Sequence, residues 1–140
     1  MNGYRTSARF REPSGIAIVP STHALVVADA GNHCIRIIDV EGMVSTLAGN
    51  GVPGYVDGRG EHAQFHAPND VLVCARQRVW VADTGNHVLR VVHLDQDVAT
   101  PAMAQDVVSP CRLAWRAQDI LVVVEEAPET EALRCFELEV

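Results

Sequence analysis

Residues 27–33 read VADAGNH and residues 81–87 read VADTGNH, so this stretch returns after 54 residues with one substitution. Upstream, the match continues with one residue of slippage and pairs Phe10 with Phe65. Self-similarity at a fixed spacing is typical of chains built from stacked supersecondary units. A third copy is degraded and lacks the Gly-Asn-His turn. We therefore expect three units, at approximately residues 10–54, 65–108 and 110–140.

The first unit consists of four short segments rich in Val and Ile, with turn residues in every gap. No segment has a helical period of adequate length, so consecutive strands should form an antiparallel meander. The strands are expected at residues 15–19, 24–28, 34–39 and 43–48. Because segments such as Ile16 to Val19 are apolar on both faces, each small sheet must be covered on both sides. Blades stacked around an axis satisfy this requirement, which predicts an all-β propeller fold.

The combined motifs resemble the NHL-repeat family of β-propellers, which is named for an Asn-His-Leu signature. The resemblance covers nearly the whole chain and rests on the repeated GNH turn, on STLAGNG at residues 45–51 and on GYVDG at residues 54–58. Cys34 and Val88 replace the Leu of the signature, a change between apolar residues. Propellers usually contain about four to eight blades. The resemblance thus implies a partial β-propeller of about two and a half to three four-stranded blades, which additional blades or self-association would close.

Composition excludes several classes of protein. The 140 residues include 11 Arg, no Lys and 18 acidic residues, and the net charge of −7 disfavours binding to nucleic acid or anionic lipid. No apolar run approaches the roughly 20 residues that span a bilayer, so no membrane association is expected. The cysteines fall in or beside predicted strands without any Cys-x-x-Cys pair, which favours reduced thiols and a cytoplasmic location. They are Cys34, Cys74, Cys111 and Cys135.

Residues that recur in both turns are expected to serve the blade rather than a metal. Asp and Asn in a tight turn can bond backbone amides, and a glycine there can supply a positive φ. Arg36 and Arg90 should pair with carboxylates of the same or the next blade. The structural set is Asp29, Gly31, Asn32, His33, Asp83, Gly85, Asn86 and His87.

The long connection at residues 49–64 is the better candidate for function, since it is polar, Gly-rich and longer than a hairpin needs. In a four-stranded meander it emerges at the same end as the Asn-His turn. His62 and His66 have a spacing that suits a metal on a helix, but helix is doubtful beside a proline, so no metal is expected. The candidate binding residues on this face are Tyr55, Arg59, Glu61, His62 and His66.

The leading functional hypothesis is a non-catalytic scaffold that binds a protein partner through this face, as the resemblance to NHL modules implies. No nucleophile elbow or phosphate loop is present, so no catalytic residue and no cofactor are assigned. Two alternatives stay open. Some similar propellers are metal-dependent lyases or hydrolases, although the apolar innermost strands disfavour an axial site here. Others bind RNA, which the acidic net charge weakens.

Overall fold

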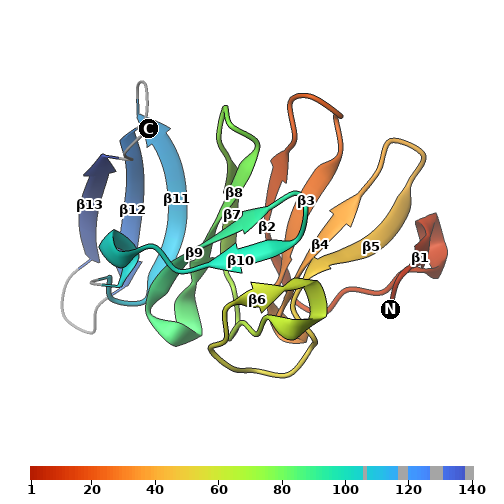
Figure 1. The fold of residues 1–140 in the computed structure, drawn as a ribbon, viewed down its shortest axis with the longest axis horizontal. Coiled ribbons are helices and arrows are strands. Elements are labelled where there is room, and N and C mark those ends of the chain that lie inside the picture. The colour runs from red at the N-terminus through yellow and green to blue at the C-terminus, as the bar shows by residue number, and fades with distance from the viewer. Residues whose placement is uncertain (106, 117–119, 127–130, 138–140) are drawn as a thin grey trace.

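The computed structural model describes residues 1–105, 107–116, 120–126 and 131–137. Three antiparallel sheets lie side by side in chain order, with β1 (Gly3–Tyr4) and β13 (Glu131–Glu137) on opposite sides of the stack (Figure 1). The described residues form strands and short 3₁₀ helices but no α-helix, and none of their helices is long and apolar enough to cross a membrane. The predicted all-β fold with propeller-type blades is therefore confirmed.

The first blade is a meander whose four main strands agree with the predicted ones to within two residues. Its strand order is β1-β5-β4-β3-β2. The strands are β1 (Gly3–Tyr4), β2 (Pro13–Ile18), β3 (Leu25–Asp29), β4 (Cys34–Ile38) and β5 (Met43–Ala48).

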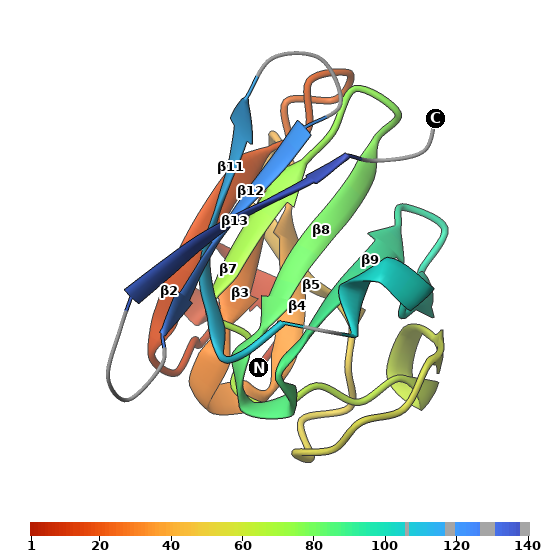
Figure 2. The ribbon, with the colours of Figure 1, turned by 90° about the vertical axis from the view of Figure 1, so that its left-hand side faces the viewer.

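The second blade repeats this arrangement in the order β6-β10-β9-β8-β7, and the third sheet follows in the order β11-β12-β13. Figure 2 shows the molecule from the left-hand side of Figure 1, where the third sheet lies in front of the other two. The strands of these two sheets are β6 (Gly58–Arg59), β7 (Asp70–Val73), β8 (Arg78–Asp83), β9 (Val88–His93), β10 (Asp97–Ala99), β11 (Pro110–Arg116), β12 (Ile120–Glu126) and β13 (Glu131–Glu137).

A fifth, outer strand in each of the first two blades is a feature that the sequence did not predict. β1 and β6 come from the connection that precedes each blade, and they pair with the outermost strand through Gly3–Val44 and Gly58–Val98. The long connection is therefore part of the blade that follows it. The 3₁₀ helices are η1 (Arg5–Ser7), η2 (Ala30–Asn32), η3 (Gly60–His62), η4 (Thr84–Asn86) and η5 (Ala102–Ala104).

The core consists of apolar side chains held between neighbouring sheets. Val71 of β7 and Phe65 are buried against Val26 and Ile35 of the first blade. A second cluster, which includes Leu89, joins the second and third sheets. Stacked sheets thus cover one another's apolar faces, which removes nonpolar surface from water.

The cysteine thiols that the structure describes in full agree with the expected reduced state. Cys34 and Cys74 are free and buried, each within a blade. The side chain of Cys135 lies outside the described residues, so the expectation for that thiol stays a prediction.

Candidate functional site

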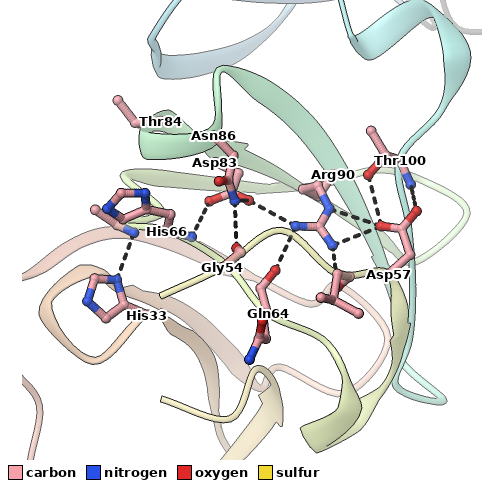
Figure 3. A network of polar contacts seen from close by, with 12 residues as sticks. His33, Gly54, Asp57, Gln64, His66, Asp83, Thr84, Asn86, Arg90 and Thr100 are labelled. Atoms are coloured by element: carbon pink, nitrogen blue, oxygen red, sulfur yellow. Dashed lines mark hydrogen bonds and ion pairs between the residues drawn. The ribbon is translucent and has the colours of Figure 1, made fainter. Parts of the chain in front are cut away.

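The Gly-Asn-His turn of the second blade is held by a buried ion pair between Asp83 and Arg90 (Figure 3). Arg90 donates to one oxygen of the Asp83 carboxylate at 2.9 Å, and Asn86 donates to the same oxygen at 2.8 Å. The other oxygen accepts from the backbone N–H of His66 at 2.9 Å. Burial raises the pKa of the Asp83 carboxyl, and these donors oppose that rise. A buried carboxylate with three donors fixes the turn against the connection.

The first blade contains the same network at the equivalent positions. The carboxylate of Asp29 accepts from Asn32 at 2.9 Å, from Arg36 at 3.0 Å and from the backbone N–H of Arg11 at 2.8 Å. Both arginines pair with a carboxylate of their own blade, as expected. The recurring Asp and Asn therefore hold together elements within one blade.

The expected positive φ at Gly31 and Gly85 is wrong. The left-handed residues are His33, with a φ of 52°, and His87, with a φ of 55°. Glycine is needed for close approach instead. Each glycine donates its N–H to a carbonyl of the connection, and a Cβ at Gly85 would lie 2.5 Å from the carbonyl oxygen of His66.

The two turn histidines link successive blades. Nδ1 of His33 accepts from the backbone N–H of Ala67 at 3.0 Å, and Nδ1 of His87 accepts from that of Ser109 at 3.0 Å. Each ring thus bonds the segment that leads into the first strand of the next sheet. Burial, together with His66, lowers the pKa of His33. No group of three His, Cys, Asp or Glu side chains within the described ranges could hold a metal ion.

Two of the five candidate residues of the connection lie within the network of the second blade. The ring of Tyr55 lies over the guanidinium of Arg90, 5.1 Å from ring centre to Cζ. His66 lies beside His33, with 5.7 Å between ring centroids. Their recognition role stays a prediction, and the structure gives Tyr55 a packing contact as well.

The other three candidates, Arg59, Glu61 and His62, line one open groove of about 760 Å³. The connection and the Asn32 turn meet there at one end of the blades, as the meander geometry predicted. All three side chains are exposed. The groove is lined further by Met1, Asn2, Asn32, Cys34, Arg36, Thr46, Gly49, Asn50, Gly51, Gly60 and Gln96.

Sequence reasoning missed Asn2, which occupies the place that Asp57 has in the second blade. Asp57 accepts from Nε and Nη2 of Arg90 at 3.2 and 2.8 Å. Asn2 accepts from Nη2 of Arg36 at 2.9 Å and from Oγ1 of Thr46 at 3.0 Å, and it makes no bond with Nε of Arg36. Nε of Arg36 is buried and has no hydrogen-bond partner among the described residues. The offset of 55 that aligns Phe10 with Phe65 also aligns Asn2 with Asp57, so the signal was present in the sequence.

Comparison with known proteins identifies the NHL repeat in this sequence. The sequence profile of the NHL repeat matches residues 10–38. NHL repeat-containing protein 2 of Gallus gallus is 32% identical over 88 residues, which cover 63% of this chain and 12% of that protein. The chain therefore spans about an eighth of the length of this relative.

Solved structures of low sequence identity share the fold. A protein of unknown function from Bacteroides thetaiotaomicron superposes with a TM-score of 0.71 at 18% identity, over 81% of this chain and 32% of that one. Virginiamycin B lyase from Staphylococcus aureus superposes with a TM-score of 0.57 at 11% identity, over 99% of this chain and 44% of that one. The repeated turn network, the blade topology and the sequence matches agree that the chain contains the NHL repeat.

Proposed function

We propose that this chain is a non-catalytic binding scaffold that engages a protein partner through the groove described above. One observation carries the proposal. One wall of the groove consists of residues that the repeat does not dictate, since Glu61 and His62 stand where the first unit has Thr6 and Ser7. Exposed side chains that differ between otherwise equivalent blades are free to serve recognition.

The size and polarity of the groove fit an extended segment of a protein. Arg59 and His62 supply donors and Glu61 supplies an acceptor, while Asn32 and Thr46 add neutral polar groups on the opposite wall. A cavity of 760 Å³ is within the range of about 300–1,000 Å³ typical of ligand sites. A short stretch of polypeptide therefore suits the groove better than a flat protein surface does.

The enzymatic and RNA-binding alternatives have weaker support. A lyase or hydrolase would need polar side chains along the innermost strands, and β2 and β7 present Ile16, Ile18, Val71 and Val73. A net charge of −7 without any Lys opposes RNA. The proposal includes the cytoplasmic location that the cysteine pattern favours.

A peptide-display selection on the immobilised chain tests this function. The selection should enrich peptides that bind the chain through the groove. Their affinity for the Glu61→Ala/His62→Ala variant of the chain should be at least about tenfold lower, because the loss of a contact worth about 1.4 kcal/mol lowers the affinity by a factor of ten. The matched control is Thr6→Ala/Ser7→Ala, which makes the same change at the equivalent positions of the first unit and should leave affinity unchanged. Enriched peptides that bind the groove variant as tightly as the unmodified chain would contradict the proposal, provided that both variants melt like that chain.

A further inference from the structure

Two histidines from different elements lie together at the junction between the first two blades. His33 ends the turn after β3, and His66 lies in the segment that leads into β7. Their ring centroids are 5.7 Å apart, with the ring planes inclined at 58° (Figure 3). His66 is exposed and His33 is half-buried, so a group from solvent can reach the pair. Of the five candidate residues, His66 is the one that neither lines the groove nor packs over Arg90.

The hydrogen bond from His33 to the second blade decides which of its ring nitrogens carries a proton. Nδ1 accepts from the backbone N–H of Ala67 at 3.0 Å, so the proton of the neutral ring is on Nε2. No described residue accepts a hydrogen bond from Nε2. A metal ion at Nε2 would require the ring to lose this proton as well. The ring therefore suits an acceptor, such as a carboxylate oxygen, better than a metal.

Positive charge gathers around the two rings. Burial, followed by the charges of His66 and Arg11, lowers the pKa of His33. The Arg11 side chain runs along the same turn, since its Cγ lies 2.6 Å from the place that a Cβ of Gly31 would take. Asp83 opposes these charges, but its carboxylate is buried and already accepts from three donors. An anion beside the rings would relieve the repulsion between the cationic groups.

The junction between the second and third sheets has the same backbone contacts but lacks the pair. The backbone N–H of Ser109 donates to Nδ1 of His87 at 3.0 Å. The preceding residue, Val108, donates its N–H to the carboxylate of Glu125 at 2.9 Å. Val108 therefore stands where the first junction has His66. The second imidazole is thus specific to one junction and is not dictated by the repeat.

We propose that the His33–His66 pair binds a carboxylate of the partner protein, with Arg11 adding to the attraction. This inference rests on the proposed function and assigns an acidic side chain, Asp or Glu, to the partner. Nε2 of His33 would donate to one carboxylate oxygen and the exposed ring of His66 to the other, and hydrogen bonds to an ionised acceptor are the stronger kind. His33 lies between Asn32 and Cys34 of the groove wall, so a segment in the groove can place a side chain at the pair.

A capped hexaglutamate peptide is the probe, with capped hexaglutamine as its uncharged control. Titrated into the whole chain, hexaglutamate should shift the imidazole NMR signals of His33 and His66, and hexaglutamine should not. Binding should strengthen as the pH falls from 7.5 to 6.5, because histidine gains positive charge in this range while Glu stays ionised. His66→Val, which copies the residue of the second junction, should weaken binding about tenfold, because a hydrogen bond to a charged group is lost.

The second junction supplies the matched variant. Val108→His places a second imidazole beside His87, so the peptide should then bind at two sites instead of one. Since Val108 and His66 are both exposed, neither variant should change the melting temperature at pH 7.5. A variant chain that melts like the unmodified chain attributes any change in binding to the imidazole itself.

The outcomes separate this inference from the proposed function. If hexaglutamate binds the His66→Val chain as tightly as the unmodified chain, or if hexaglutamine binds equally well, the carboxylate assignment is wrong. Displayed peptides that still depend on Glu61 and His62 would then leave the proposed function standing, and peptides that do not would overturn both. If inorganic phosphate shifts the signals of the pair and hexaglutamate does not, the site takes a phosphoryl group and the carboxylate assignment is overturned.

Discussion

The imidazole of His33 accepts a hydrogen bond from the backbone N–H of Ala67, 3.0 Å away at the start of the next blade. A ring nitrogen accepts a hydrogen bond only when it carries no proton. The bond therefore belongs to the neutral form of His33, and it ties blade stacking to pH.

Acidification should destabilise the chain through His33. Burial, the neighbouring His66 and Arg11 lower the pKa of this ring below 6.5, although Asp83 opposes them. The unfolded state then binds the proton more readily, so stability is fully present above pH 6.5 and is lost as pH falls through 6.5 toward the lowered pKa. Thermal midpoints measured from pH 7.5 to pH 5 should show this loss.

His33→Asn is the matched variant for that measurement. Asn tolerates the left-handed backbone at this position and offers an amide oxygen as acceptor, but it does not titrate. The raised pKa values of Asp70 and Asp83 persist in both chains, so the difference between their pH profiles isolates His33. Parallel profiles would show that His33 contributes nothing to the pH dependence.

Gly85→Ala should lower the free energy of unfolding by about 1–3 kcal/mol, the range for an overpacked site. The added Cβ would meet the His66 carbonyl oxygen at 2.5 Å, and a backbone atom cannot rotate away. Urea unfolding measures the loss. Gly51→Asn is the control, because a Cβ there comes no closer than 3.7 Å to other atoms and Asn tolerates the positive φ. A larger loss in the control would exclude close approach as the cause.

Asn2→Asp should stabilise the first blade by about 0.5–1 kcal/mol. A carboxylate at this position can accept from Nε of Arg36, which is buried without a partner among the described residues, as Asp57 accepts from Arg90. The gain is modest because Asp57 itself is 46% exposed and water screens such a pair.

Asp57→Asn should have the opposite effect in the second blade. Chemical denaturation of both variants at low and high salt tests the pair, and equal shifts at both salt concentrations would argue against an ionic origin.

Cys34 should resist alkylation in the folded chain. Burial, with Asp29 nearby, raises the pKa of this thiol to about 11, so its thiolate fraction near pH 8 is about a hundredfold below that of an unshifted thiol. Iodoacetamide labelling followed by peptide mass spectrometry reports the rate at Cys34 directly. The unfolded chain in urea is the control, where labelling should be fast. Rapid labelling of the native chain would show that the groove exposes this sulfur.

Periodic features of the fold could be predicted from sequence, and contacts between repeats could not. The turn signals and Val-rich segments predicted the strands of the first blade because they depend on local chemistry. The pairing of Gly58 with Val98 spans 40 residues and leaves no local pattern, so the fifth strand was missed. Gly85 was assigned a positive φ because turn glycines often have one, whereas here the backbone carbonyl and the ring of His66 lie too close for a Cβ.

The candidate site residues were likewise predicted only in part. Arg59, Glu61 and His62 were found because they differ between the repeats, and they do share one groove. Tyr55 satisfied the same criterion, but its ring packs over Arg90. A difference in residue type between two repeats does not show whether the side chain faces solvent or packs against another residue of the blade.

The outer face of β2 is apolar and exposed. Ile16 is 62% exposed, whereas Val71, its counterpart in the second blade, is 2% exposed because the first blade covers it. Ile18 and Phe10 extend the same apolar face. Within the described residues no sheet covers it, and an apolar face of this kind favours association.

The chain should therefore self-associate as its concentration rises, and Ile16→Glu/Ile18→Glu should reduce the sedimentation coefficient toward that of a monomer. Because both side chains are exposed, the melting temperature of the variant should change little. Val71→Glu makes the same change at the covered position, and it should unfold the chain because the charge would be buried between two sheets. A double variant that still associates would place the contact elsewhere. A chain that stays monomeric without the substitutions would show that stacking on this face needs more than the apolar surface of β2.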